Sequence, residues 1–183
     1  MNLGVQAATG EWLIFMNAGD VFADSTVLQR VAGALHEGRP LVCGGFIMVW
    51  GAHAVTYTAR PLGIGLIPSS HQAMLVRTES ARRHPFDVSL RVGADYDQVC
   101  RIAPMPGDIV MTDVVIARVE GEGFSSSNRR LAHHDYRDII ARHYGRTRAW
   151  VWYTGTMART AVTGVLKRIV PENVIAWTRR LRA

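Results

Sequence analysis

Hydrophobic residues recur along the first two-thirds of the chain in short runs separated by polar, glycine- or proline-containing turns. Short apolar runs bounded by turn residues predict buried strands, and apolar positions three and four apart predict helices. The strands predicted in this way cover Trp12–Met16, Leu41–Trp50, Ala54–Tyr57, His71–Arg77 and Ile109–Arg118. The predicted helices cover Asn2–Ala8, Asp24 or Ser25 to His36, Leu131–Tyr144, and Tyr96–Ile102 as the body of a helix that begins near Gly93 or Ala94. Thr78–Arg83 is predicted as a short helix or a turn. This alternation of strands and helices predicts an α/β layer architecture.

The apolar run Trp12–Met16 follows a glycine turn at Gly10 and is followed by the turn-forming cluster Asn17–Asp20. A run of this kind is typical of a strand buried on both faces. In open α/β sheets ligands bind at the carboxyl ends of strands, and Asp20 lies at such an end. A carboxylate there can hold a divalent cation that neutralises a diphosphate. On the residues alone, a role for Asp20 in the turn or in the start of the next helix is favoured over a ligand role.

Two segments rich in glycine and polar residues interrupt this pattern. Arg60–Ser70 contains two prolines and two glycines, which predicts a mobile loop that can act as a lid. Gly121–Asn128 predicts a second loop, rich in glycine and serine.

The end of the chain differs from the rest in composition. Arg148–Val170 predicts one long helix, Pro171 ends it, and a short arginine-rich stretch, Glu172–Arg182, follows. Its tryptophans and arginines are expected either at a membrane interface or packed on the preceding domain. We therefore divide the chain into residues 1–145, a domain, and residues 146–183, an amphipathic helical extension.

The charge balance restricts the partners. The chain has 183 residues and a formal net charge of +6, and Lys167 is its one lysine. Arginine binds phosphate and carboxylate groups in a bidentate manner, so this composition suits an anionic ligand or a membrane surface. Base bias of the genome explains it equally well. Because no nucleic-acid-binding signature is present, nucleic acid is not expected as a partner.

Cysteine usage and hydropathy indicate the compartment. Cys43 and Cys100 are too few for a disulfide framework and read as buried thiols, which favours a reducing cytoplasm. No basic segment followed by an apolar core predicts a signal peptide, and no apolar run is long enough to predict a membrane span. We expect a cytoplasmic location, with peripheral attachment to the inner face of the cell membrane as the alternative.

The string from Met1 to Asp20 resembles the middle of a family 2 glycosyltransferase domain. In that family Asn and Gly, here Asn2 and Gly4, precede an Ala-x-Gly turn and a buried strand that ends in an acidic metal motif. A subgroup similar to colanic acid and phenolic-glycolipid transferases has Asn-x-Gly-Asp there, as in Asn17–Asp20. The resemblance implies that Asp20 binds Mg²⁺ or Mn²⁺ with the diphosphate and that Asn17 contributes a weaker ligand or a sugar-nucleotide contact. One carboxylate and one amide make a weaker site for a hard cation than two carboxylates.

A second group of segments resembles the acceptor side of the same subgroup. His71-Gln72 opens a predicted strand, a Phe-Asp turn follows, and Ala-Asp-Tyr-Asp, ending at Asp97, begins a helix. The resemblance implies that Asp95 is the general base of an inverting transfer, with His71, Gln72 and Asp97 on the substrate side. On the residues alone, Asp95 caps the helix and Asp97 favours its first turn. His71 is equally well explained as a hydrogen-bonded strand histidine.

The resemblance implies a partial GT-A (Rossmann-like) mixed sheet flanked by helices, with a C-terminal helical extension. It implies transfer of a sugar from a nucleotide-sugar donor to a glycan or lipid-linked acceptor in cell-envelope polysaccharide biosynthesis. The part of the family that binds the base and ribose of the donor has no counterpart in this sequence, so we expect a truncated form or one completed elsewhere. A non-catalytic fragment or membrane-surface interaction module is the alternative. A nucleotidyltransferase is disfavoured because no glycine- and lysine-containing phosphate loop is present.

Overall fold

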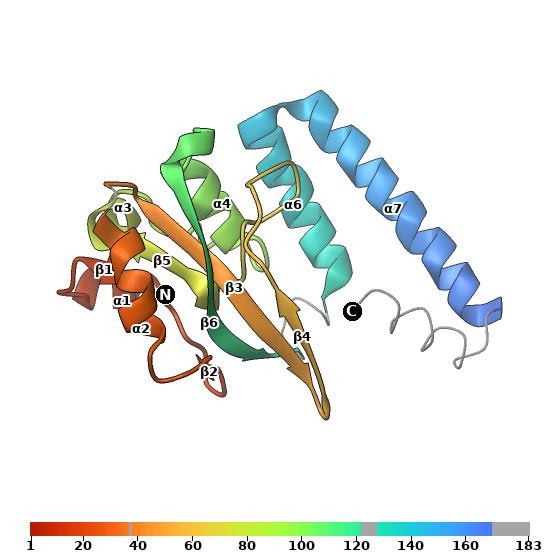
Figure 1. Cartoon of the computed structure of the whole chain (residues 1–183). Coiled ribbons are helices and arrows are strands. Elements are labelled where there is room, and N and C mark those ends of the chain that lie inside the picture. The colour runs from red at the N-terminus through yellow and green to blue at the C-terminus, as the bar shows by residue number, and fades with distance from the viewer. Residues whose placement is uncertain (37, 122–127, 170–183) are drawn as a thin grey trace.

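The computed structural model describes residues 1–36, 38–121 and 128–169, and it contains a mixed six-stranded sheet with helices on both faces (Figure 1). This confirms the predicted fold class. The strands are β1 (Trp12–Leu13), β2 (Val21–Phe22), β3 (Leu41–Trp50), β4 (His53–Tyr57), β5 (Met74–Arg77) and β6 (Ile109–Glu120). The α-helices are α1 (Asn2–Ala7), α2 (Val27–Val31), α3 (Thr78–Arg83), α4 (Ala94–Ile102), α6 (Arg129–Tyr144) and α7 (Arg146–Ile169). The 3₁₀ turns are η1 (Ala32–His36), η2 (His71–Ala73) and η3 (Pro106–Asp108).

The sheet is built around the parallel pair of β3 and β6. Its strand order is β1-β5-β3-β6-β2, and β4 forms an antiparallel hairpin with β3 outside this path. The pairings of β1 with β5, β5 with β3, and β2 with β6 are antiparallel. Within the described residues β1 therefore lies at one end of the sheet with a single neighbour.

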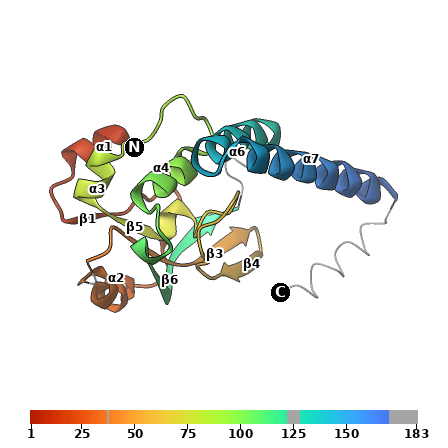
Figure 2. The same cartoon turned by 90° about the horizontal axis from the view of Figure 1, so that it is seen from above.

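Alternation along the strands divides the core between the two faces of the sheet. In β3, Leu41 and Cys43 pack with α1, α3 and α4, whereas Val42 packs with α2 on the opposite face. This is the period of two that a strand imposes on its side chains. Figure 2 shows the same layering, with α1, α3 and α4 above the sheet and α2 below it.

A third apolar cluster joins α4 to the antiparallel pair of α6 and α7. Tyr96 and Cys100 of α4 meet Ile139 and Ile140 of α6 and Ala149 of α7, and all five are buried. The last two helices lie side by side next to α4 (Figure 2). The division of the chain after residue 145 stays a prediction.

The strand predicted over Trp12–Met16 is shorter than expected. Only Trp12 and Leu13 pair with a neighbouring strand, and the side chains of the whole run are partly rather than fully buried. Its side chains still alternate between the two faces, with Leu13 and Phe15 against one cluster and Ile14 and Met16 against the other. The prediction that this run packs against both faces of the sheet was correct. The prediction that its side chains are fully buried was wrong, because β1 pairs with a single neighbouring strand.

The strand predicted over His71–Arg77 is wrong for its first three residues. They form the 3₁₀ turn η2, in which the Ala73 N–H donates to the Ser70 carbonyl at 2.8 Å, and β5 begins at Met74. The loop Arg60–Ser70 is irregular as predicted, but hydrogen bonds connect it to α4. The hydroxyl of Tyr96 donates to Gly63 O at 2.7 Å and accepts from Gly65 N at 2.9 Å.

The structure bears on the predicted thiols, and two predicted segments fall wholly or mostly outside it. Cys43 and Cys100 are buried free thiols, and burial raises their pKa values to about 12 and about 11. Most of Gly121–Asn128 and all of Glu172–Arg182 lie outside the described residues. No helix in the described part of the chain is long and apolar enough to cross a membrane.

Gly44 lets β3 and β6 approach closely at a register shift. A Cβ added there would lie 2.5 Å from both the Val114 carbonyl oxygen and the Ile116 Cδ1 atom. We expect Gly44→Ala to lower the free energy of unfolding by about 1–3 kcal/mol, because backbone atoms must move to admit the methyl group. Urea unfolding followed by circular dichroism measures this. Gly33→Ala is the control, since nothing lies within 4 Å of its Cβ position. Equal losses in the two variants would contradict the close-approach argument.

Candidate active site

Asp20 sits in a polar environment at the end of the turn that follows β1. Its Oδ2 atom accepts hydrogen bonds from Gln72 Nε2 at 2.6 Å and from the Asn17 backbone N–H at 3.3 Å. Its Oδ1 atom accepts from the Glu120 backbone N–H at 3.2 Å. The turn after β1, the 3₁₀ turn η2 and the end of β6 therefore converge on one carboxylate, although they are far apart in sequence.

The 3₁₀ turn η2 links this carboxylate to a second one. Gln72 is buried, accepts a hydrogen bond from the Ser70 hydroxyl and directs its amide at Asp20. The preceding residue, His71, places its Nδ1 atom 3.9 Å from Oδ2 of Asp95 at the start of α4. Two adjacent side chains of one turn thus reach the two carboxylates that the sequence singled out.

The carboxylate of Asp95 is held in a partly buried position. Its Oδ1 atom accepts a hydrogen bond from the Tyr96 backbone N–H at 2.8 Å, and 30% of its side chain is exposed. Burial raises the pKa of this carboxyl above its ordinary value, while the nearby His71 acts in the opposite direction and lowers it. A carboxylate with a raised pKa is a better proton acceptor than a fully solvated one, which suits a general base.

The structure does not bring all predicted site residues together. Asp97 is fully buried, and its carboxylate accepts from Arg101 Nε and Arg142 Nη1, each at 2.9 Å, and lies 2.9 Å from His143 Nε2. These contacts engage the carboxylate between α4 and α6, so Asp97 joins two helices instead of facing a ligand. The side chain of Asn17 is exposed, and its backbone N–H makes the contact to Asp20.

A divalent cation is the cofactor that the resemblance implies. The groups around Asp20 show whether this carboxylate could hold one. Within residues 1–36, 38–121 and 128–169, no group of three or more His, Cys, Asp or Glu residues could hold a metal ion. Asp20 receives N–H donors but forms no ion pair with a described basic side chain. Glu120 lies beside it, since a methyl group on Gly19 would be 3.5 Å from the Glu120 carboxyl carbon. This set fits a cation that arrives with a diphosphate, because such ions take one or two protein carboxylates plus phosphate oxygens.

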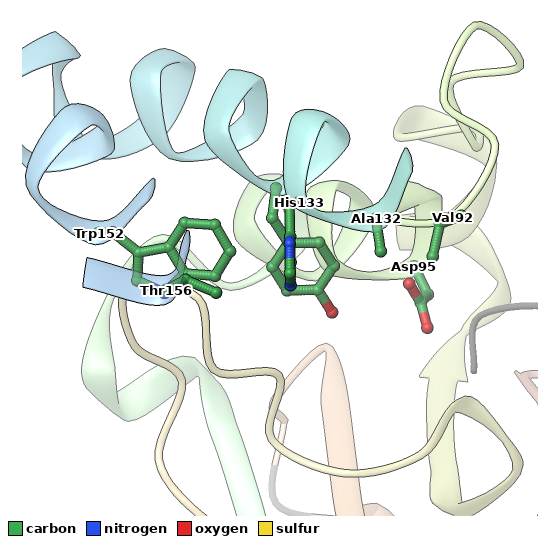
Figure 3. Close-up of a pocket in the computed structure, with 7 residues that line it drawn as sticks. Val92, Asp95, Ala132, His133, Trp152 and Thr156 are labelled. Atoms are coloured by element: carbon green, nitrogen blue, oxygen red, sulfur yellow. The ribbon is translucent and has the colours of Figure 1, made fainter. Parts of the chain in front are cut away.

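Beside Asp95 a pocket with a volume of about 220 Å³ opens between α4, α6 and α7. Figure 3 shows Asp95 and Val92 toward one end, Trp152 and Thr156 toward the other, and His133 and Ala132 between them. The lining residues are Val92, Asp95, Ala132, His133, Tyr136, Trp152 and Thr156.

Sequence reasoning missed three contributors to this region. Glu120 is the last residue of a strand and carries no motif. Tyr136 and Trp152 follow helical spacing, which predicts packing and does not reveal that both also border an open space. The Glu120 contact could not be found from local sequence, because it depends on a pairing 100 positions away.

Curated relatives of the chain are glycosyltransferases. It is 28% identical over 190 residues to a "PGL/p-HBAD biosynthesis glycosyltransferase" of Mycobacterium bovis (strain BCG / Pasteur 1173P2), an alignment that covers 98% of this chain and 70% of the relative. The corresponding protein of Mycobacterium tuberculosis (strain ATCC 25618 / H37Rv) matches to the same extent. The chain matches no protein-family profile.

Solved structures of TarS from S. aureus share the fold. The complex of TarS 1-349 with UDP superposes with a TM-score of 0.57 at 14% sequence identity, covering 96% of this chain and 56% of the TarS 1-349 chain. The complex with UDP-GlcNAc gives a TM-score of 0.53 at 15% identity, covering 79% of this chain and 51% of the TarS 1-349 chain. The chain therefore spans about half the length of these structures. Taken together, the sequence relatives and the shared fold support a glycosyltransferase.

Proposed function

We propose that the chain acts in an inverting, family 2-like transfer of a sugar from a nucleotide-sugar donor to a hydroxyl of a glycan or lipid-linked acceptor. The observation that carries this proposal is the turn η2, whose adjacent side chains His71 and Gln72 contact Asp95 and Asp20. The binding of UDP and UDP-GlcNAc by TarS, whose fold is similar, supports a nucleotide-sugar donor.

In the proposed reaction Asp95 accepts the proton of the acceptor hydroxyl while that oxygen attacks the anomeric carbon of the donor. The bond between this carbon and the diphosphate oxygen breaks, and its electron pair leaves with the nucleoside diphosphate. Because attack comes from the face opposite the diphosphate, the configuration at the anomeric carbon inverts. The hydrogen bond from Tyr96 N–H and the nearby His71 fix the orientation of Asp95.

Asp20 takes the donor side in this proposal. A Mg²⁺ or Mn²⁺ ion carried by the diphosphate would neutralise the charge that develops on the leaving group. Asp20 would hold that ion, with Glu120 as a second carboxylate nearby. Gln72 and the Asn17 backbone N–H keep the Asp20 carboxylate in position through their hydrogen bonds.

The outer face of α7 supports a membrane-surface role for the same protein, on the inner face of the cell membrane. This helix of 24 residues contains no acidic residue, and its side chains Trp150, Val151 and Val162 are 56%, 68% and 57% exposed. From Ala158 to Gly164 every side chain is exposed, as the helix extends beyond the sheet (Figure 1). Basic and apolar side chains on one exposed helix suit an anionic lipid surface, where a lipid-linked acceptor would be found.

Replacing the proposed base tests the reaction. In a full-length version that includes the donor-binding part, we expect Asp95→Asn to lower the rate of sugar transfer from a nucleotide-sugar by at least about 100-fold, because an amide cannot accept the proton. Release of UDP and formation of glycosylated acceptor, followed by mass spectrometry, measure this rate. Asp113→Asn is the matched control, since Asp113 is exposed on β6. Transfer by Asp95→Asn at the rate of the control would rule out this role.

The pH dependence offers a separate test. Only the ionised Asp95 can act as base, so kcat/KM should fall as pH drops through its raised pKa, above the ordinary value of 3.8. His71 lowers that pKa by its charge, so His71→Gln should move the acidic limb to higher pH. His53→Gln, on the exposed strand β4, should leave the limb in place. An unmoved limb in His71→Gln would mean that a group other than Asp95 titrates.

A charge placed on the outer face of α7 tests the membrane role. We expect Val162→Asp to reduce co-sedimentation with phosphatidylserine-containing vesicles roughly tenfold, because it removes apolar contact and adds repulsion. Val88→Asp is the control, since Val88 is 87% exposed in a loop outside α7. Vesicles of phosphatidylcholine alone should bind both proteins weakly. Equal sedimentation of the two variants would remove the membrane role.

A further inference from the structure

Helix α7 is attached to the rest of the protein through one stripe of side chains near its start. Ala149 is buried, and the partly buried side chains that follow are Trp152, Tyr153, Thr156 and Met157. These positions recur at the three- and four-residue spacing that places side chains on one face of a helix, and this face meets α6. From Ala158 to Gly164 every side chain is exposed, and α7 extends beyond α6 (Figure 2). The attachment is therefore short compared with the 24 residues of the helix.

The two last helices differ in how firmly they are held. Arg142 of α6 donates a hydrogen bond to the buried carboxylate of Asp97, which ties α6 to α4. The contacts between α6 and α7 include aromatic rings, among them Tyr153 and His134 with ring centroids 5.6 Å apart. A single residue, Gly145 with a φ of 96°, joins the two helices. Because backbone rotation at such a glycine changes the angle between two helices, α7 can swing while α6 stays in place.

The stripe on α7 also holds the loop Arg60–Ser70. The indole of Trp152 lies directly against Gly65, where an added Cβ would overlap it. From the other side the hydroxyl of Tyr96 contacts Gly63 O and Gly65 N. The loop leads directly into η2, whose side chains contact the two carboxylates of the site. The position of α7 is thus connected to the site through one loop.

A lipid surface would distinguish between a packed and a released α7. A ligand shifts a conformational equilibrium only through a difference in its affinity for the two states. When α7 lies on α6, it offers lipid its outer side, with Trp150 and Val151 exposed. A released α7 offers Trp152, Tyr153 and Met157 as well, and indole and phenol rings are favoured at a membrane interface. The released helix therefore binds the surface more tightly, and the surface favours release.

We propose that α7 is a latch that an anionic lipid surface opens. In solution the latch is closed, because Trp152 rests on the loop Arg60–Ser70 and forms one end of the pocket beside Asp95 (Figure 3). On the surface α7 swings about Gly145, its stripe exchanges α6 for lipid, and the loop and the pocket open. The inference rests on the membrane-surface role given under the proposed function and adds the regulation of the site by that surface.

A distance measurement on the full chain tests the swing. Thr160→Cys on α7 and Asp113→Cys on β6 place nitroxide labels at exposed positions, while Cys43 and Cys100 are buried. Pulsed electron paramagnetic resonance should give one interspin distance in solution and a second one on phosphatidylserine-containing vesicles. Vesicles of phosphatidylcholine alone should leave the first distance in place. An unchanged distance in vesicle-bound protein would overturn the proposal.

Hydrogen exchange tests the contact between Trp152 and the loop. Phosphatidylserine-containing vesicles should speed amide exchange of the segment around Gly65 at least about fivefold and leave β3 unchanged. Trp152→Ala should give the fast exchange without lipid, and vesicles should add nothing further. Trp150→Ala is the matched control, because Trp150 lies on the same helix, is 56% exposed and does not line the pocket. It should keep the slow exchange in solution.

The outcomes separate the latch from the membrane role. If the chain co-sediments with vesicles while the loop exchanges at its solution rate or more slowly, the latch fails and the membrane role stands. If the chain does not co-sediment at all, both fail, and the transferase assignment is untouched. Equal exchange in Trp152→Ala and Trp150→Ala would also overturn the latch. If exchange of β3 shows that Trp152→Ala disturbs the fold, the labelled chain, which keeps Trp152, decides.

Discussion

The site depends on a buried carboxylate that takes no part in the proposed chemistry. Asp97 is completely removed from solvent and is contacted by Arg101 on its own helix and by Arg142 and His143 on α6. A buried carboxylate without partners is strongly unfavourable, and breaking a buried pair by removing one partner costs about 3–5 kcal/mol. The charge of Asp97 therefore fixes α6 against the first turn of α4, and with it the pocket between these helices.

Three consecutive residues at the start of α4 have three different partners. Asp95 faces His71 and the pocket, Tyr96 holds the loop Arg60–Ser70 and stacks on Tyr136, and Asp97 holds α6. Successive residues of a helix point about 100° apart. The side chains of one turn can therefore contact η2, the loop Arg60–Ser70 and the neighbouring helix α6. The proposed base is thus positioned by the contacts of the two residues that follow it in sequence. Small changes in the packing of α6 would be transmitted directly to Asp95.

The sequence predicted the elements better than their edges and contacts. Leu41–Trp50 and Thr78–Arg83 have the predicted bounds, because apolar patterning and turn residues define them locally. His71–Ala73 could not be predicted as a 3₁₀ turn, because its conformation positions Gln72 for a hydrogen bond to Asp20, 52 positions away. Asp95 and Asp97 look equivalent in the sequence, both acidic in a first helical turn. Their separation into a partly exposed carboxylate and a buried, ion-paired one follows from where α6 packs, which no local pattern encodes.

Helix α7 lines the pocket with one side and exposes apolar side chains on the other. The inner side of α7 contributes Trp152 to the pocket beside Asp95, and its outer side exposes Trp150 and Val151 next to basic residues. Residues 150 and 152 lie about 200° apart around a helix, so one short segment can face the pocket and a surface outside the protein. If the protein lies on a membrane surface through its outer side, the same helix that touches the lipid also borders the pocket beside Asp95.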